Sequence, residues 1–361
     1  MSLKEELISK KPREKDGSRS SGRFDYQKDW ALCKLLELHQ HNDDYLLAFD
    51  FHDDIIVIDS EKNPNLIEFY QIKTKTSGNW TTTSLIQSKK SKTEKTLSIM
   101  GKIYDNKISF PKNTKSLNFI SNATFSMALN KDEEKSIDKK EICLSDLSQK
   151  EIKKIVDKIK SEHTLTEEPD LHNITFFKVS DLSLTDHENH TIGKLSKFLE
   201  NLYSDKNFRV GVIYRTLFDE IKRKNNYAFD IDKYDDLVEH KSIGQNQFTN
   251  MLNIILPKIN LESTWNNIEQ RLNTEKLSIL EIKKISRSWL KYQVERMNLG
   301  SDTLQNIRIE ITKIISKSES TTYSKLMQES LDIFYSTYDG DYSLYDEYYL
   351  KAIILMEFCE L

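Results

Sequence analysis

The chain has 361 residues, of which 37% are hydrophobic and 30% are charged, with a formal net charge of -4. This length predicts roughly two domains. No apolar run approaches the roughly 20 residues of a membrane span, which excludes an integral membrane protein. The N-terminal residues lack the apolar segment of a secretory signal, so we expect a cytoplasmic protein. Three widely spaced cysteines, Cys33, Cys143 and Cys359, fit neither a disulfide framework nor a zinc site.

Positive charge is concentrated in one segment. Between Lys73 and Lys115 there are ten lysines against Glu94 and Asp105, a net +8 within a chain of net -4. Such a cluster is often only a solvated surface. It can also be an electrostatic binding site for the phosphates of a nucleic acid.

The N-terminal half predicts an α/β fold. Residues 1–22 are polar and aperiodic, which favours a flexible tail. The predicted elements that follow are a helix at 24–39, strands at 45–51, 54–59 and 66–73, a helix at 81–104 and a strand at 116–121. This order is typical of an α/β sandwich, in which a sheet is flanked by helices.

The C-terminal half is poor in glycine and predominantly helical in pattern. After a helix at 146–162 and a strand at 174–179, the predicted helices cover 187–204, 207–224, 243–256, 262–274, 277–298, 302–317, 321–337 and 343–359. We therefore predict an α/β domain at 23–205 and an all-α domain at 206–361.

Several common catalytic motifs are absent. The chain contains no phosphate-binding glycine loop and no nucleophile elbow, which argues against ATP hydrolysis and serine-hydrolase chemistry. His187 and His190 have a spacing that would allow them to share a metal, but no third ligand accompanies them, which favours a capping or surface role.

Three polar residues in the predicted strands form a candidate catalytic site. Alternation places Gln71 and Lys73 on one face of the third strand. Asp54 stands at the start of the preceding strand, where its carboxylate could meet the end of the hairpin partner. Asp53 is the alternative if Asp54 is dispensable.

Asp, Gln and Lys in this arrangement suit phosphodiester hydrolysis. Asp54, Gln71 and the Ile72 carbonyl would provide oxygen ligands for Mg²⁺ or Mn²⁺, and Lys73 would orient the attacking water and stabilise the transition state. The neighbouring lysines would then bind the DNA backbone, in particular Lys75, Lys89, Lys90 and Lys92. The alternative is an amphipathic edge strand without catalytic function, because a Q-x-K triplet occurs often by chance.

The same segments resemble the PD-(D/E)xK nuclease superfamily in its Q-x-K variant. This resemblance implies that the domain at 23–205 is a nuclease with a restriction-endonuclease-like core, a mixed sheet flanked by helices. More narrowly, SGRFDYQKDWALCKLLEL, YLLAFDFHDDIIVIDS, FYQIKTKTSGNW and SLNFISNA are similar to the double-stranded DNA endonuclease domain of CD-NTase-associated protein 4. The resemblance implies Asp54, Gln71 and Lys73 as the catalytic set. Gln27 stands where many members of the superfamily carry a glutamate. Its buried helix face requires a hydrogen-bond partner, either at the metal site or on the backbone.

The resemblance also implies a setting. The sensor domain that follows the nuclease in CD-NTase-associated protein 4 is α/β, whereas this C-terminal part is helical. An antiphage pair with a HerA-type hexameric ATPase fits better, with the helical domain forming a homo-oligomer. Two alternatives stay open, a cyclic-oligonucleotide-activated endonuclease and a non-catalytic DNA-binding adaptor. The final helix, at 343–359, is apolar on several sides, so it either fills the core of its domain or forms an interface.

Overall fold

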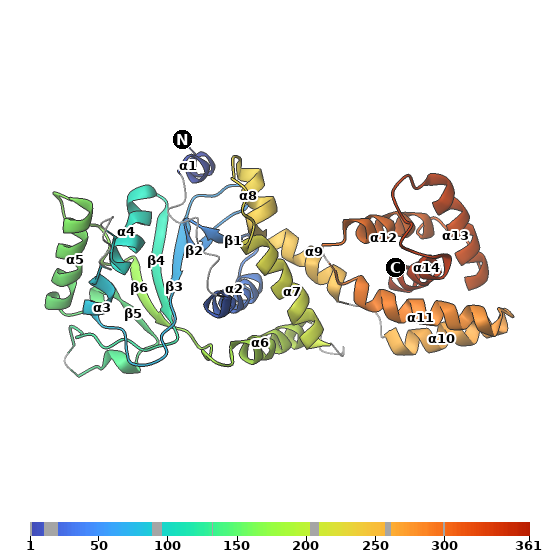
Figure 1. The fold of residues 1–361 in the computed structure, drawn as a ribbon, viewed down its shortest axis with the longest axis horizontal. Helices are drawn as coiled ribbons and strands as arrows, with labels where there is room; N and C mark the ends of the chain where they lie inside the picture. Colours follow the sequence, from blue (N-terminus) through green and yellow to red (C-terminus); the bar gives the residue numbers. More distant parts are fainter. Residues whose placement is uncertain are drawn as a thin grey trace. The chain divides into compact units, whose positions relative to one another are not determined.

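A computed structural model describes residues 2–10, 21–88, 96–131, 133–202, 209–256, 261–298 and 300–361. The chain divides into two compact units, one formed by Met1–Phe198 with Ile221–Phe248 and the other by Leu199–Glu220 with Thr249–Leu361. The first unit contains a mixed sheet flanked by helices, and the second is helical, as the sequence predicts (Figure 1).

The strands of the described residues form one sheet in the order β5-β6-β4-β3-β2-β1-β7. Their bounds are β1 Leu46–Phe51, β2 Asp53–Ile58, β3 Ile67–Ile72, β4 Thr114–Ser121, β5 Glu141–Cys143, β6 Thr175–Val179 and β7 Ser242–Gly244. The central strands β3, β4 and β6 are parallel, while β1, β2, β5 and β7 join antiparallel. The carboxyl ends of the parallel strands therefore share one edge of the sheet.

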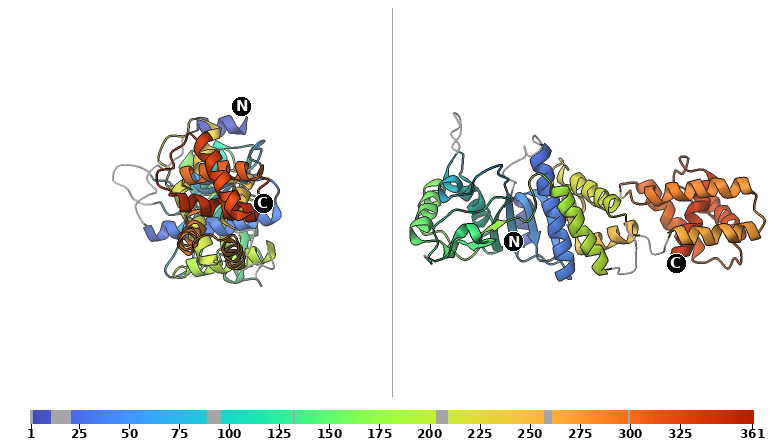
Figure 2. Two further views of the ribbon diagram at one scale, coloured as in Figure 1. Left: turned by 90° about the vertical axis from the view of Figure 1, so that its right-hand side faces the viewer. Right: turned by 90° about the horizontal axis from the view of Figure 1, so that it is seen from below.

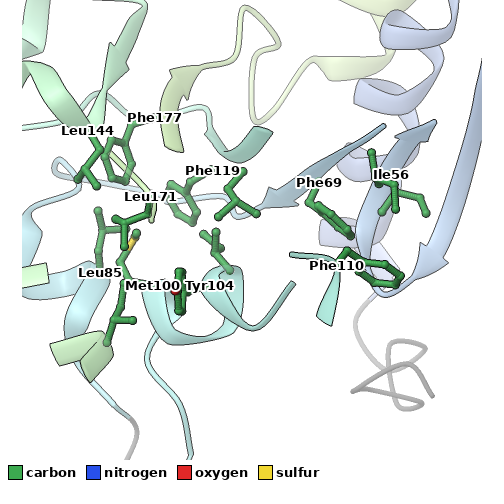
Figure 3. Close-up of a cluster of buried hydrophobic side chains, with 14 of the residues drawn as sticks. Ile56, Phe69, Leu85, Met100, Tyr104, Phe110, Phe119, Leu144, Leu171 and Phe177 are labelled. Atoms are coloured by element: carbon green, nitrogen blue, oxygen red, sulfur yellow. The ribbon is translucent and has the colours of Figure 1, made fainter. Parts of the chain in front are cut away.

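The sheet is covered on both faces. Helix α2 (Ser21–His41) lies on the face of Tyr70, whose ring contacts Trp30 at 5.1 Å, and Figure 2 shows α2 as a long blue helix along the sheet. The other face carries the main apolar core, which includes Phe69, Phe110 and Phe119 (Figure 3). Each such fully buried aromatic contributes roughly 1.5–3 kcal/mol through removal of apolar surface from water.

The predicted helix at 81–104 is wrong at residues 87–88 and 96–98, which are not helical. The structure has α3 at Thr82–Ile86 and α4 at Ile99–Ser109, and residues 89–95 between them lie outside the described residues. Helix α4 starts late because the Ser98 hydroxyl accepts a hydrogen bond from the Gly101 amide, an N-cap that fixes the first turn.

The expected flexible tail at 1–22 contains an ordered helix, α1 (Leu3–Ser9). A capping box between Ser2 and Glu5 starts this helix, and Leu3 and Leu7 are buried in the main core. Burial of two leucines offsets the entropy of ordering a seven-residue helix that would be unstable alone.

Three further elements were not predicted. Strands β5 and β7 have only three residues each, too few to show an alternating pattern, and α8 (Tyr234–Lys241) has only eight. Strand β7 pairs with β1 through Leu46↔Gly244 and so extends the sheet at this edge. Helices α5 (Gln149–His163) and α6 (His187–Leu202) match the sequence prediction closely.

The helical unit has its own core, built around Trp289 and Tyr292. Its region contains α7 Val210–Asn225, α9 Gln245–Ile255, α10 Leu261–Thr274, α11 Ile279–Glu295, α12 Asp302–Ile315, α13 Tyr323–Thr337 and α14 Glu347–Glu360, of which α7 and α9 cross a boundary between the units. Helix α14 is buried from Tyr349 to Glu357 among the other helices, so it fills the core of this unit. Among the described residues, no helix is both long enough and apolar enough to cross a membrane.

Candidate active site

The register of the β2–β3 hairpin brings the predicted site residues together. Ile55 pairs with Tyr70 and Ile56 with Phe69, and one further step along this antiparallel register places Asp54 opposite Gln71. The expected strand start is therefore close to the observed one, and both side chains lie on the same face of the sheet.

One oxygen of Asp54 collects three hydrogen bonds. Asp54 Oδ2 accepts from Gln71 Nε2 at 2.5 Å, from the Ile72 amide at 2.7 Å and from Lys73 Nζ at 3.3 Å. The Asp54 side chain is 17% exposed and that of Lys73 is 41% exposed. The carboxylate is thus held rigidly, while the ammonium group remains within reach of a ligand in solution.

Asp53 has a different environment from Asp54. Its Oδ2 accepts a hydrogen bond from Asn106 Nδ2 in α4 at 2.6 Å, and its Oδ1 accepts from the Asp54 amide at 2.8 Å. The carboxylate that contacts Gln71 and Lys73 is therefore that of Asp54.

Gln27 bonds to the backbone of the same strand. Its Nε2 donates to the Ile72 carbonyl oxygen at 3.0 Å, which satisfies a half-buried amide and ties α2 to the end of β3. Of the two partners considered from sequence, the backbone is the one that the structure presents.

The oxygen atoms at this position fit a hard divalent cation. Asp54 Oδ1 and Gln71 Oε1 accept no hydrogen bond from the described residues, so both are available as ligands. Carboxylate and amide oxygens are the donors that Mg²⁺ and Mn²⁺ take in proteins. Within the described part of the chain, no three His, Cys, Asp or Glu side chains gather into a metal-binding group, so Asp54 is the single anionic donor of this set.

The segment after β3 is fixed by a residue whose role the sequence did not suggest. Asn122 Oδ1 accepts from the Lys75 amide at 2.8 Å, and Asn122 Nδ2 donates to the Lys75 carbonyl at 2.9 Å. The Lys73 amide also donates to the Ile120 carbonyl at 3.0 Å. The end of β4 therefore holds the backbone on both sides of residue 74; only the motif SLNFISNA gave a signal for it.

Of the predicted DNA-binding lysines, Lys75 lies within the described residues. Lys75 Nζ donates to the Asn79 carbonyl at 2.5 Å and lies 4.7 Å from the Trp80 ring centroid. Lys89, Lys90 and Lys92 lie outside the described residues. Two other lysines of the basic segment are paired with acids, Lys107 with Asp170 at 3.4 Å and Lys115 with Glu68 at 2.8 Å.

The two histidines of α6 contact different groups. His187 Nδ1 lies 2.5 Å from Oδ2 of the buried Asp29 in α2, whereas His190 Nδ1 lies 3.2 Å from the Asp181 carbonyl oxygen. His187 therefore links two helices, in keeping with a structural role for this pair.

A family model described as the Cap4 dsDNA endonuclease domain matches residues 15–225, more than half of the chain. The chain belongs to this family. The Cap4 nuclease match includes Gln27, Asp54, Gln71 and Lys73, and it confirms the resemblance noted from sequence motifs.

A curated relative extends the similarity beyond the Cap4 nuclease match. The Lamassu protein LmuA of Bacillus cereus (strain VD014) is 26% identical over 305 residues, which cover 83% of this chain and 81% of LmuA. Residues 1–225 alone cannot supply 83% of the chain, so the similarity to LmuA includes part of the sequence after the nuclease match.

Proposed function

We propose that this chain is a metal-dependent endonuclease that cuts double-stranded DNA in a bacterial antiphage defence system of the Lamassu type. The observation that carries the proposal is the convergence of Asp54, Gln71 and Lys73 at the end of the β2–β3 hairpin. Membership in the Cap4 nuclease family and the similarity to LmuA support it. The proposal assumes a cytoplasmic location, where invading DNA is encountered.

The chemistry follows from the residues of this site. Asp54 and Gln71 would hold Mg²⁺ or Mn²⁺ through their carboxylate and amide oxygens, with the Ile72 carbonyl oxygen as a further metal ligand. When bound, the cation supplies charge neutralisation at the phosphate and a lower pKa for a water molecule. The Gln71 amide and the Ile72 N–H fix the orientation of the Asp54 carboxylate. Lys73, partly exposed beside it, stabilises negative charge as it develops on the phosphate oxygens.

A cleavage assay tests the proposal. Supercoiled plasmid is incubated with the protein in Mg²⁺, Mn²⁺ or EDTA, and Lys73→Ala is compared with Lys115→Ala, whose lysine pairs with Glu68 on the other face of β3. We expect metal-dependent cutting, a rate about 100- to 1000-fold lower for Lys73→Ala, and little effect of Lys115→Ala.

The alternatives predict other outcomes in this assay. A non-catalytic adaptor would bind DNA without cutting it under any condition. An effector activated by cyclic oligonucleotides would cut only after such a ligand is added. Undiminished cutting in EDTA, or by folded Lys73→Ala protein, would refute the assigned site.

The helical unit is the proposed region of self-association and partner docking, with a HerA-type ATPase as the partner considered. The apolar residues of α14 from Tyr349 to Met356 are buried in the core, so we place the contact on another helix. Helix α11 exposes Leu280 (66%), Leu290 (60%) and Val294 (55%) at heptad spacing on one face, with the exposed Lys283 and Arg287 between the first two.

Light scattering after size-exclusion chromatography tests this surface. The chain would be measured alone and with the ATPase, as wild type and as Leu290→Asp. The control is Ile309→Asp, because Ile309 of α12 is exposed to a similar degree, 53%. Dissociation by Leu290→Asp but not by Ile309→Asp is expected, and a strictly monomeric, fully active wild type would contradict the proposal.

A further inference from the structure

The turn that precedes Asp54 has an unusual backbone. Asp50, near the end of β1, and His52, which joins β1 to β2, have φ angles of 45° and 63°, and Phe51 between them pairs with Asp53. The left-handed region is unfavourable for residues with a side chain, although Asp and His tolerate it better than most. Such a conformation persists only where its surroundings hold it in place, and it often lies beside a functional residue. Here the functional residue, Asp54, is two positions away.

His52 is held from the N-terminal helix. Its side chain is buried, and Nε2 donates to the Leu7 carbonyl at the end of α1 over 3.0 Å. The imidazole also packs edge-on against Phe51 and Phe110, with centroids 4.5 and 5.0 Å away. Phe110 belongs to the core drawn in Figure 3, so His52 is connected to both α1 and the main core.

The end of α1 is itself anchored beside this contact. Lys10 Nζ donates to the Ser109 carbonyl and lies 4.6 Å from the ring centroid of Phe110. The carbonyl that His52 uses therefore belongs to an element fixed at both its buried leucines and its C-terminal end.

Asp50, the other left-handed residue, is held by a lysine from α8. Lys241 Nζ donates to the Asp50 carbonyl at 3.0 Å and lies 3.8 Å from its carboxylate, with the lysine side chain only 9% exposed. Burial lowers the pKa of Lys241, and Asp50 opposes this effect. A buried ammonium group is costly without partners, so this contact strongly favours one position of the turn.

Both supporting elements lie outside the family match. Helix α1 ends before residue 15 and α8 begins after residue 225. The two helices contact one another, with Lys4 Nζ 4.6 Å from the Tyr234 ring centroid, and α8 packs on β1 (Figure 1). Helices α1 and α8, which precede and follow the matched residues in the sequence, thus contact one another and both contact the β1–β2 turn.

We propose that His52 and Lys241 are positioning residues, which hold the β1–β2 turn so that the Asp54 carboxylate stays aligned with Gln71 and Lys73. The inference rests on the proposed function for the role of Asp54. A displacement of about 1 Å in a reacting group can lower a rate roughly 100-fold, so loss of either contact should slow cleavage without weakening DNA binding.

The variants His52→Ala and Lys241→Met test this role. The matched control is His163→Ala, because His163 Nε2 also donates to a backbone carbonyl, that of Gly101, at 3.0 Å. His52→Asn serves as the rescue variant, since asparagine tolerates a left-handed backbone and retains a side-chain donor. Single-turnover cleavage and DNA affinity are measured separately, with thermal melting as the check on folding.

We expect His52→Ala and Lys241→Met to cut about 10- to 100-fold more slowly at saturating DNA, with affinity changed less than about twofold. His163→Ala should cut like wild type, and His52→Asn should recover most of the lost rate. Wild-type rates for both His52→Ala and Lys241→Met, or an equal loss in His163→Ala, would overturn the proposal.

A second readout does not depend on cleavage. The Ile72 amide donates to Asp54 Oδ2, so its hydrogen exchange reports whether the carboxylate is in place. We expect about tenfold faster exchange of this amide in His52→Ala and no change in His163→Ala. Faster exchange in His52→Ala, if the wild-type protein cuts no DNA, would refute the nuclease function but support the positioning role of His52. Unchanged exchange would refute that positioning role and leave the nuclease function untouched.

Discussion

Charged side chains serve different purposes in the two units. In the helical unit, Arg296 and Glu360 are 1% and 3% exposed and share two hydrogen bonds of 2.9 and 2.8 Å. In the sheet unit, one oxygen of Asp54 accepts the three hydrogen bonds from Gln71, Ile72 and Lys73. The Lys73 side chain remains 41% exposed. Both oxygens of the Glu360 carboxylate are thus used by Arg296, whereas Asp54 Oδ1 accepts no hydrogen bond from the described residues and is available to a ligand.

This difference shows how a structural ion pair can be distinguished from a candidate site. The helical unit contains further hydrogen bonds between charged and polar side chains. Glu357 accepts from Arg308 Nε at 2.8 Å and from the Tyr292 hydroxyl at 2.6 Å. Substitution in such a network should change stability, whereas substitution at Asp54 should change activity. The four predictions below test this distinction.

The largest effect is expected for Glu360→Gln in the helical unit. This change leaves the Arg296 guanidinium buried without its bidentate carboxylate, and breaking a buried ion pair typically costs about 3–5 kcal/mol. Urea denaturation would measure the loss. Glu310→Gln, which breaks the exposed pair with Lys313, is the control and should cost less than about 1 kcal/mol. Equal losses for the two variants would mean that Arg296 and Glu360 contribute no more than a surface pair.

Asp54→Asn should show the opposite behaviour. The substitution keeps the shape of the side chain but removes the negative charge, so we expect a 100- to 1000-fold slower cleavage rate, about 2.7–4 kcal/mol in the barrier. The melting temperature should remain near that of wild type. Asp53→Asn is the matched comparison, because Asp53 bonds to Asn106 and not to Lys73. A greater loss of cleavage in Asp53→Asn would exchange the assignments of the two aspartates.

Glu162 is a carboxylate of the sheet unit whose two oxygens are both hydrogen-bonded, unlike those of Asp54. It accepts from the Ser98 hydroxyl and amide and from the Ser88 hydroxyl, at 2.7–2.9 Å. Burial tends to raise the pKa of Glu162, but these hydrogen bonds outweigh it and lower the pKa below the ordinary value of 4.5. Because the folded-state pKa is depressed, the stabilisation is present above about pH 4.5 and is lost as the pH falls through the folded-state value.

Glu162→Gln should therefore lower the free energy of unfolding by about 1–3 kcal/mol at pH 7 and by progressively less below pH 4.5. Urea melts at several pH values would measure this difference, with the exposed Glu167→Gln as control. A loss that is constant between pH 7 and pH 3 would show that the carboxylate charge is not responsible.

The smallest effects are expected for the lysines predicted to bind DNA. Replacing Lys89, Lys90 or Lys92 with Gln should each reduce the salt slope of DNA binding by about 0.9, if each contacts one phosphate. Lys283→Gln and Arg287→Gln on α11 of the helical unit should leave that slope unchanged. Fluorescence anisotropy over a range of salt concentrations would measure it. Equal changes from both groups of variants would place DNA contacts in the helical unit as well.

The periodicity of apolar residues predicted most of the strands and helices. Gln71 and Lys73 could be assigned to one face from alternation alone, and Asp54 could be placed near them because a turn-rich segment at 60–65 joins the two strands. Except for the eight-residue α8, the helices of the C-terminal half were found because each repeats apolar residues at helical spacing over ten residues or more. These are local properties, which the order of residues determines directly.

Other features depend on contacts between distant residues. Leu3 and Leu7 make α1 part of the core only because the sheet and α8 lie beside it, and α14 could have formed an interface until its neighbours were known. The choice between Asp53 and Asp54 depended on Asn106, and the left-handed turn before them depends on Leu7 and Lys241. The sequence by itself determined the longer helices and strands, whose apolar residues repeat with the period of the element. Only the tertiary structure decided which polar groups meet, because the hydrogen bonds that select them join residues up to 191 positions apart.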